Sequence, residues 1–450
     1  MTEHPPTTQH HILKSAPKPG REIGLIALKR MLQTRSPMDA LAVFHQELGD
    51  VFRITFPGFN PIMLVGPEAA RFLLVESRDD MRWRMEGEPI ALLLRHGVLM
   101  EDGDSHDALR RVMNPALHRR MLTQYVETMV KRTDEITAHW HTGATYDMLI
   151  EARKIALLIL TDSLFNVDFS PEMARLWAGV LRAVKYISPG LWVVWRGFAP
   201  MGYNRKLREI DTYLFQIIAE RRKFPGGDDD LLGALVHDSA LTDSLIRDQL
   251  MTMLIAGHDT STANLAWTLY LLGKHPDAMQ RAREEVQTVI GDGEPQFEHL
   301  RDLTYLGAVI DESLRLYPPI HLGSRFAARD LDFNGFHIPA EMRVLYSIYL
   351  THRHPDYWSE PDAFKPERFI DNHRPEPYTF IPFGGGPRNC IGGAFAQVEA
   401  KVVLARILQR YDLRLLQNDV RVHMGATLEP RPGVKMRVKK QTHKILTKPL

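Results

Sequence analysis

The sequence predicts a mainly helical protein with a smaller β-rich region, an α+β fold. The run from about Thr242 to Lys274 is the longest stretch with helical apolar periodicity. At ~1.5 Å per residue it would extend roughly 48 Å, enough to cross the whole molecule. Two short alternating runs near residues 51–65 predict strands, and the pattern of the next two hundred residues is largely helical. A small sheet packed beside a helical body satisfies both observations.

Composition narrows the class of protein. The chain has 450 residues, 44% of them hydrophobic, so it can bury a large core. The formal net charge of +1 gives no whole-chain attraction to nucleic acid. A single cysteine excludes an intrachain disulfide and fits the reducing cytoplasm, where we expect the protein to be. The N-terminus lacks the apolar core of a signal peptide, and no apolar run reaches the ~18 residues that cross a bilayer, so we expect no transmembrane anchor.

The chain begins with a polar segment rich in Pro, His and Thr. We expect residues 1–22 to be a flexible tail and residues 23–450 to form a single domain. A helical pattern over residues 23–48 is broken at Arg35-Ser36-Pro37. The β-rich parts are expected at about 45–70, where Pro57-Gly58-Phe59-Asn60 forms a turn, at about 320–350, where Asn334-Gly335 predicts a hairpin, and in C-terminal hairpins at about 415–440.

Two segments before the long helix carry polar patterns of interest. Residues 86–100 are too apolar for an ordinary surface loop, so we expect them to cover another part of the molecule. Next, His106 and Arg110 are four residues apart and share one helix face. Spacing alone favours an exposed basic helix there.

The middle of the long helix contains residues that weaken helices. Gly257 costs ~1 kcal/mol relative to alanine in a helix interior. Asp259 and Thr260 are also poor interior formers, and the Thr260 hydroxyl can bond the carbonyl of Ala256 and bend the helix. From these residues alone, a bend with a solvent-facing Asp259 is the favoured interpretation.

Cys390, the only cysteine, lies in a loop of unusual composition. Three glycines and a proline precede it, and strong helix formers follow from Gly393 onward. The thiol therefore sits just before a helix N-terminus, which favours a thiolate, the form that binds soft metals and haem iron. A small buried hydrophobic cysteine and a catalytic nucleophile are the alternatives.

The pattern Phe-x-x-Gly-x-Arg-x-Cys-x-Gly over residues 383–392 resembles the haem-ligand loop of the cytochrome P450 superfamily, in its soluble bacterial form. The resemblance covers roughly residues 40–440 through five motifs in the family's order. It implies the cytochrome P450 fold, with the long helix over a heme b, and Cys390 as the metal ligand. Because Ala256 stands where some relatives tether haem through a glutamate, the haem is expected to be non-covalent. The implied cofactor-binding residues are His106, Arg110, Arg325, Phe383, Arg388 and Cys390.

The resemblance also implies catalytic residues, a buried structural triad and a substrate pocket. Ala-Gly-x-Asp-Thr over residues 256–260 is similar to the family's oxygen-activating helix, which implies catalytic roles for Thr260 and Asp259 in holding oxygen and delivering protons. Glu312, Arg315 and Arg368 match a buried structural triad. The implied substrate pocket comprises Ile90, Leu94, Ile255, Ala256, Ile320, Leu322, Ala426 and Thr427.

Electron supply and substrate access follow from the same resemblance. The basic cluster of His118, Arg119, Arg120, Lys131 and Arg132 is either a solvated face or, with Arg111, a dock for a separate acidic ferredoxin or flavodoxin. Residues 186–203, rich in aromatics, resemble a mobile lid over the substrate channel; a helix–helix turn packed on the core is the alternative. We expect a monomer.

The leading functional prediction is a haem-thiolate monooxygenase. It would insert one atom of O₂ into an apolar organic substrate, by hydroxylation or epoxidation, with fatty acids, terpenoids, steroids and macrolides fitting equally. A peroxygenase that uses hydrogen peroxide on the same fold is the first alternative, and the Asp259–Thr260 pair argues against it. A non-catalytic haem-thiolate sensor, with His258 as a sixth ligand, is the second.

Overall fold

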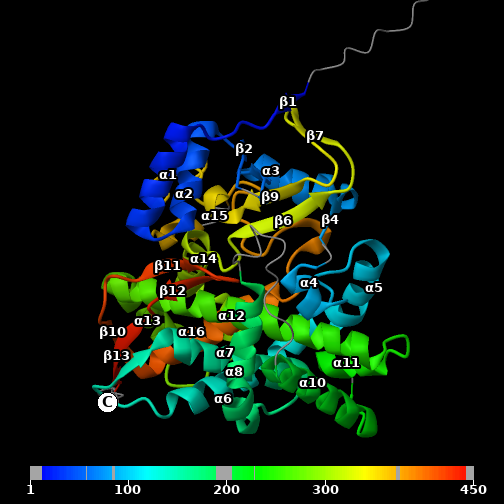
Figure 1. Ribbon diagram of the computed structural model, residues 1–450. Helices are drawn as coiled ribbons and strands as arrows, with labels where there is room; N and C mark the ends of the chain where they lie inside the picture. Colours follow the sequence, from blue (N-terminus) through cyan, green and yellow to red (C-terminus); the bar gives the residue numbers. More distant parts are fainter. Residues whose placement is uncertain are drawn as a thin grey trace, which may run out of the picture.

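The computed structural model describes residues 13–56, 58–83, 87–188, 205–227, 229–370 and 375–441. A β-rich part with the N-terminal helices occupies one end of the molecule, and a larger helical body occupies the other (Figure 1). This arrangement confirms the predicted α+β fold.

Helices form most of the body. Their bounds are α1 (Arg21–Thr34), α2 (Pro37–Leu48), α3 (Pro67–Arg71), α4 (Pro89–Leu94), α5 (Gly103–Met113), α6 (Arg119–Thr137), α7 (Met148–Phe165), α8 (Met173–Ile187), α10 (Arg205–Lys223), α11 (Leu231–His237), α12 (Asp243–Lys274), α13 (Pro276–Val289), α14 (Thr304–Leu316), α15 (Ile348–Thr351) and α16 (Gly393–Arg410).

The strands form small sheets from segments far apart in the chain. Their bounds are β1 (Lys14–Ser15), β2 (Val51–Arg53), β3 (Ile62–Leu64), β4 (Met81–Arg82), β5 (Thr145–Asp147), β6 (Leu322–Ala327), β7 (Leu331–Phe333), β8 (Phe336–Ile338), β9 (Arg343–Ser347), β10 (Tyr411–Leu415), β11 (Arg421–Met424), β12 (Leu428–Arg431) and β13 (Lys435–Lys440). The largest sheet has the order β2-β3-β9-β6-β4, and the others are β1-β8-β7, β10-β13-β5 and the β11–β12 hairpin.

The long helix α12 begins and ends for local reasons. The side chain of Thr242 accepts a hydrogen bond from the amide of Leu245 and caps the N-terminus, and Asp243 lies favourably in the first turn. The C-terminus stops at Lys274, because Pro276 starts α13 and has no amide to continue α12. These bounds agree with the prediction to within one residue.

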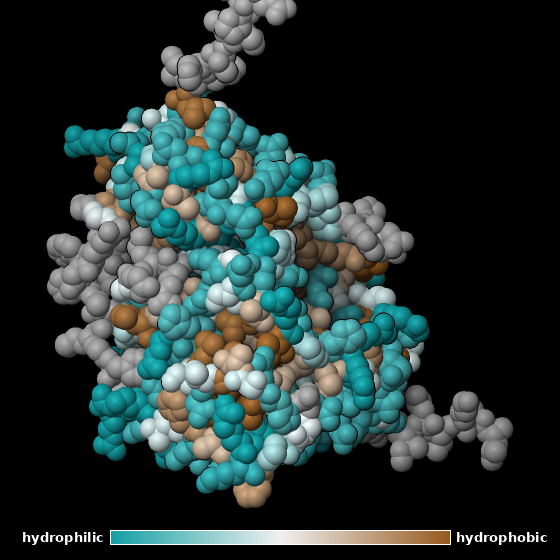
Figure 2. Space-filling model, turned by 90° about the vertical axis from the view of Figure 1, so that its right-hand side faces the viewer, coloured by the Kyte–Doolittle hydropathy of each residue, from teal (hydrophilic) through white to brown (hydrophobic). Residues whose placement is uncertain are grey.

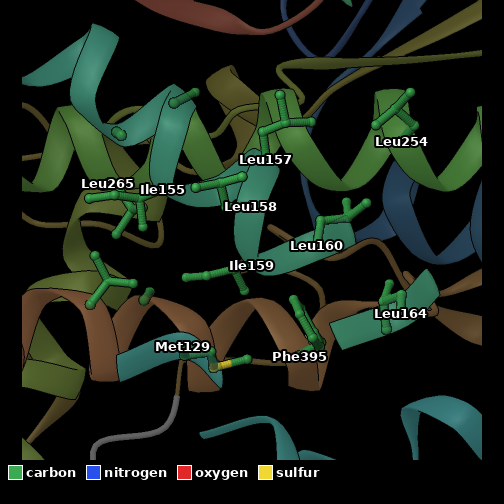
Figure 3. Packing of buried hydrophobic residues seen from close by; sticks show 14 of the residues in the cluster. Met129, Ile155, Leu157, Leu158, Ile159, Leu160, Leu164, Leu254, Leu265 and Phe395 are labelled. Carbon is green, nitrogen blue, oxygen red and sulfur yellow. The ribbon is translucent and has the colours of Figure 1, made fainter. Parts of the chain in front are cut away.

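The centre of the helical body is a layer of apolar side chains around α7. Leu157, Leu158, Ile159 and Leu160 of α7 are buried and lie between α12 and α16 (Figure 3). A helix that is apolar on all sides is stable only when it is covered on all sides. The packing therefore fixes α12 and α16 relative to each other, and α16 follows the loop that contains Cys390.

Among the residues that the structure describes, three hairpins join strands that are neighbours in the sequence. Asn334 and Gly335, with φ of 51° and 78°, join β7 to β8 and occupy the left-handed region that a tight two-residue turn requires. The β11–β12 hairpin has its tip at residues 425–427. The antiparallel β2–β3 pair matches the hairpin predicted near residues 51–65.

The N-terminal expectation needs a correction. β1 pairs in parallel with β8, where the amide of Lys14 donates to the carbonyl of Gly335 at 2.8 Å, and α1 begins at Arg21. Backbone pairing to the sheet therefore orders part of the segment that we expected to be tail. Residues 1–12 lie outside the described part of the chain.

The predicted lid falls largely outside the described residues. Tyr186 is buried within α8, and of residues 186–203 only those up to Ser188 are described.

Within the described ranges, no helix is both long and apolar enough to cross a bilayer. The face on the right-hand side of Figure 1 is mostly hydrophilic, with apolar groups gathered in patches in its lower half (Figure 2).

Candidate functional site

The middle of α12 is accessible to solvent at a few residues only. From Ile246 to Leu272 every residue of the helix is buried except Ala256, which is exposed, and Gly257 and Thr260, which are half-buried. Ala256 and Thr260 are four residues apart and so lie on one face of the helix. Ala256, Gly257 and Thr260 thus form an accessible strip on α12, whereas the other residues between Ile246 and Leu272 are covered.

The glycine and threonine of this strip have specific contacts. The Thr260 hydroxyl donates to the carbonyl of Ala256 at 2.6 Å, the bond anticipated from the sequence. A Cβ on Gly257 would lie 2.4 Å from Cδ1 of Leu160 in α7. A larger residue at Gly257 would therefore require the Leu160 side chain to move, so the glycine fits the close contact of α12 with this side chain.

Asp259 is buried, so the interpretation of a solvent-facing carboxylate is wrong. Its Oδ2 accepts a hydrogen bond from the Thr427 hydroxyl at 2.7 Å, and its Oδ1 lies 3.8 Å from Nη2 of Arg153. Arg153 also contacts Glu429, so two buried carboxylates share one guanidinium. Burial, with a further contribution from the negative charge of Glu429, raises the pKa of Asp259 to about 6. Asp259 can therefore hold or release a proton near neutral pH.

The loop before α16 is held by its backbone. The amide of Cys390 donates to the carbonyl of Phe383 at 2.8 Å, which closes the loop around the thiol. Gly386 has a φ of 64°, and a Cβ there would lie 2.3 Å from the carbonyl oxygen of Leu74. Only glycine fits at that position, because both the backbone conformation and the close approach exclude a side chain.

The thiol of Cys390 lies inside the protein yet remains accessible. The residue is exposed, but burial among protein atoms raises the pKa of its thiol, although the amide of Gly392 and the charge of Arg110 act in the opposite direction. The expected thiolate is therefore not favoured in the protein alone; a bound metal ion would supply the charge that deprotonates the thiol.

Four predicted cofactor-binding side chains gather in one region. His106 is buried. Arg110 donates hydrogen bonds to the backbone oxygen and to Oδ1 of Asn389, at 2.8 and 3.2 Å. The charge of Arg110 also acts on the ring of His106. Arg388 lies close enough to His106 and Arg325 for their charges to act on each other. Side chains from α5, β6 and the cysteine loop therefore lie near one another.

Among the described residues, Arg325 forms no ion pair with a carboxylate and Arg388 forms one. Both contact Trp83: the guanidinium carbons lie 3.3 and 4.9 Å from its ring centre. Nη2 of Arg388 lies 3.2 Å from Oδ1 of Asp102 without hydrogen-bond geometry, and Nε1 of Trp83 has no partner within the described residues. Burial lowers the pKa of Arg388 to about 10, partly offset by Asp102, and the charge of Arg325 lowers it further. Such a cluster would be stabilised by an anionic ligand.

The predicted structural triad is assembled. Arg315 forms two hydrogen bonds with the Glu312 carboxylate, at 2.7 and 2.8 Å, and both side chains are fully buried. Nε of Arg368 lies 3.4 Å from the same carboxylate. Arg315 also donates to the backbone oxygens of His352, Pro361 and Ala363, so the triad ties α14 to the segment that leads to the cysteine loop.

The predicted pocket residues fall into two groups. Leu94 and Ile255 are fully buried in the main core, and Thr427 is buried against Asp259. The others are accessible to different degrees: Ala256 and Ile320 are exposed, and Ile90, Leu322 and Ala426 are half-buried.

The basic surface is partly as expected. Arg111, Arg119 and Arg120 are exposed. Arg132, which we placed in the same basic cluster, is buried and ion-paired with Glu135, Asp162 and Asp168, so it belongs to the core. The local sequence around Arg132 did not indicate this burial, because Asp162 and Asp168 lie outside α6, the helix that contains Arg132.

Several residues of the site were not singled out from the sequence. Arg153 and Glu429 support Asp259, and Trp83 joins the two arginines. Glu399 of α16 is buried and bonds Ser261 of α12 at 2.5 Å. Each contact joins residues distant in the chain and follows no local motif, so spacing alone gave no sign of it.

Comparison with known proteins agrees with this geometry. A family model described as "Cytochrome P450" matches residues 16–438. A "Putative cytochrome P450 139" of Mycobacterium tuberculosis is 31% identical, over 89% of this chain and 97% of that protein. "Cyclooctatin synthase" of Streptomyces melanosporofaciens is 28% identical, over 97% and 96%. A solved cyanobacterial structure, "Retinoic acid bound cyanobacterial CYP120A1", has a TM-score of 0.83 at 26% identity and covers 95% of this chain and 100% of that one. The chain belongs to the cytochrome P450 family and is a haem-thiolate monooxygenase.

Proposed function

We propose that this enzyme inserts one atom of dioxygen into an apolar organic substrate, with electrons delivered by a separate acidic ferredoxin or flavodoxin. The observation that carries the proposal is the Asp259–Thr260 pair at the accessible strip in the middle of α12. A buried carboxyl that titrates near neutral pH stands beside a hydroxyl at the solvent-reachable strip. Dioxygen cleavage consumes two protons, whereas a reaction that starts from hydrogen peroxide brings its protons with it.

The residues present fit a heme b. The accessible thiol of Cys390 would be the iron ligand, and the guanidiniums of buried Arg325 and half-buried Arg388 would take the two propionates. His106 and Arg110 would add donors from α5. When bound, the haem supplies the iron centre at which dioxygen is activated. Ala256 offers no carboxylate for a covalent tether.

The chain's own residues then have distinct tasks. Asp259 holds a proton at its carboxyl and passes it toward the accessible strip of α12. Burial is the main cause of the raised proton affinity of Asp259, and the charges of Glu429 and Arg153 adjust it in opposite directions. The Thr260 hydroxyl, oriented by its bond to Ala256, presents its oxygen to whatever occupies the strip. Apolar side chains such as Ile90 and Ile320 would exclude water around the substrate.

One contact argues against the sensor alternative. Nε2 of His258 bonds the backbone oxygen of Arg153 at 3.1 Å, and burial lowers the pKa of its ring to about 3. The imidazole is thus fixed toward α7. A ring held in this way would have to break its bond and turn to reach the strip formed by Ala256 and Thr260.

The oxygen source is tested with isotopes. Substrates are first found by titrating an apolar panel, including retinoic acid, and watching the haem absorption band. Turnover of a hit under ¹⁸O₂ with reductant should place ¹⁸O in the product; label from H₂¹⁸O₂ alone, with none from ¹⁸O₂, would establish a peroxygenase instead.

The iron ligand is tested separately. Cys390→Ser should lose the reduced carbon-monoxide band of thiolate-ligated haem, and retention of that band would refute the ligand assignment.

A further inference from the structure

A cluster of two histidines and a carboxylate lies on elements other than those that carry Cys390 and Thr260. His45 is in the last turn of α2, Asp50 is in the turn that leads into β2, and His354 is in the turn after α15. Nε2 of His45 and Nε2 of His354 lie 2.7 and 3.1 Å from the same oxygen, Oδ1 of Asp50. The two imidazole ring centres are 5.1 Å apart.

The three side chains are only partly accessible to solvent. The side chain of His354 is 7% exposed, that of His45 14% and that of Asp50 50%. Two imidazoles from different segments therefore point at the same carboxylate oxygen of Asp50.

We propose that His45, Asp50 and His354 form a binding site for a divalent transition metal ion, Zn²⁺ being the probe of choice. The three ligand atoms lie within 4.8 Å of one another. Zinc binds imidazole nitrogen and carboxylate oxygen at about 2.0–2.2 Å in a tetrahedron. A metal ion would replace the protons that the two Nε2 atoms now share with Asp50, and water would complete the coordination on the exposed side of the carboxylate.

The surroundings of His354 fit a metal ligand. Its Nδ1 lies 3.9 Å from Oδ2 of Asp356, an exposed side chain. Metal-bound histidines commonly donate their second nitrogen to such a carboxylate, which fixes the tautomer. At present Nδ1 accepts a long 3.3 Å bond from the amide of Asp356. Metal binding would give up that bond and move the proton of the ring to Nδ1, where Asp356 accepts it.

The donor set determines which ions the site takes. Two imidazoles and one carboxylate suit Zn²⁺, Ni²⁺, Co²⁺ or Cu²⁺, whereas Mg²⁺ and Ca²⁺ prefer oxygen ligands. A bound ion would tie the end of α2 to the turns before β2 and after α15. Since an ion that binds only the folded state stabilises it, the site would act as a reversible clamp on the β-rich end of the molecule.

The test uses the tag-free, haem-loaded full chain. The N-terminal segment also contains His4, His10 and His11, so a variant with these three changed to Gln is the background for all measurements. Zinc binding is followed by calorimetric titration, and unfolding temperature is measured with Zn²⁺ and with Mg²⁺. His45→Asn and His354→Gln each remove one ligand, Asp356→Asn removes the second-nitrogen partner, and His96→Gln, beside Glu101, is the matched control.

The expected result is one zinc equivalent that raises the unfolding temperature, with no effect of Mg²⁺. His96→Gln should leave binding unchanged, Asp356→Asn should weaken it roughly 10–100-fold, and loss of either ligand should weaken it at least as much. Anomalous diffraction at the zinc edge should place the ion between the three side chains. Equal zinc affinity in the background, His45→Asn and His354→Gln proteins, or an ion found only elsewhere, would overturn the proposal.

Discussion

The hydroxyl of Thr427, at the tip of the β11–β12 hairpin, donates a 2.7 Å hydrogen bond to Oδ2 of Asp259 in the middle of α12. Both residues are buried. Burial is the main reason for the raised pKa of Asp259, about 6, and the bond from Thr427 partly offsets it by favouring the charged carboxylate. The tip of a C-terminal hairpin therefore adjusts the acidity of a carboxyl on the central helix.

Removal of that bond should make Asp259 a weaker acid. In Thr427→Val the carboxylate loses a donor, so we expect its pKa to rise above about 6. The protonated carboxyl has an infrared band that can be titrated, and Asp259→Asn identifies it. Thr427→Ser keeps the hydroxyl and should titrate like the wild type. An unchanged midpoint in the valine variant would show that the bond does not control this proton.

Loss of the Thr260 hydroxyl should uncouple electron consumption from product formation. In Thr260→Ala we expect haem content, substrate binding and reduction to remain intact, while product per reducing equivalent falls severalfold and hydrogen peroxide appears instead. The measurement is product, reductant and peroxide in the same assay. If coupling stays at the wild-type level, the hydroxyl serves only to bend the helix through Ala256.

Asp259→Asn gives the contrasting variant. Here proton delivery itself is impaired, so we expect turnover to slow by roughly 10²-fold, the lower end of general acid–base contributions, with a smaller loss of coupling. A larger solvent isotope effect should accompany the slower turnover. Equal effects of the two substitutions on rate and coupling would contradict the separate roles of Thr260 and Asp259.

Glu399 should make stability depend on pH. Burial raises its pKa from 4.5 to about 8 in the folded protein, although the bond from Ser261 acts in the opposite direction. The folded state therefore favours the protonated form, and its contribution is complete below pH 4.5 and is lost as the pH rises toward 8. The free energy of unfolding should fall across this window by at most about 1.4 kcal/mol per pH unit.

The matched variant for this effect is Glu399→Gln, which keeps the shape and cannot ionise. Denaturant unfolding at several pH values between 5 and 8 should show a shallower decline for the variant than for the wild type. Parallel curves for the two proteins would mean that Glu399 does not titrate in this range.

Electron supply should depend on the exposed arginines of α6. We expect Arg119→Glu with Arg120→Glu to slow the first electron transfer from an acidic donor and to flatten its dependence on salt, because exposed charges mainly set the rate of association. Stopped-flow reduction measures both, and substrate affinity should not change. Arg414→Glu, an exposed position on β10, is the control. An unaltered reduction rate in the double variant would place the docking surface elsewhere.

The parts of the fold that follow local rules were predictable from the sequence. The ends of α12, the Asn334–Gly335 turn and the glycine-rich loop before Cys390 depend on capping, backbone conformation and chain stiffness, which neighbouring residues determine. The proposed catalytic pair, Asp259 and Thr260, was singled out by its motif.

Features that depend on tertiary packing were not predictable in this way. The burial of Asp259 and its link to Glu429 join α12 to a hairpin far along the chain, and the burial of Arg132 depends on Asp162 and Asp168. The acidity of Cys390 was predicted from the helix N-terminus alone, but desolvation outweighs that effect. In each case the energy comes from groups that only the fold brings together.

The pairing of β5 with β13 has a consequence for protein synthesis. Asp147, the last residue of β5 and the cap of α7, accepts hydrogen bonds from the amides of Leu149 and Val434. The ribosome releases α7 long before β13, so the nascent chain carries α7 with an unpaired strand at its start. Such an edge invites wrong partners until residues 435–440 emerge. Ribosome stalling before that point would therefore leave a nearly complete enzyme that is prone to aggregation.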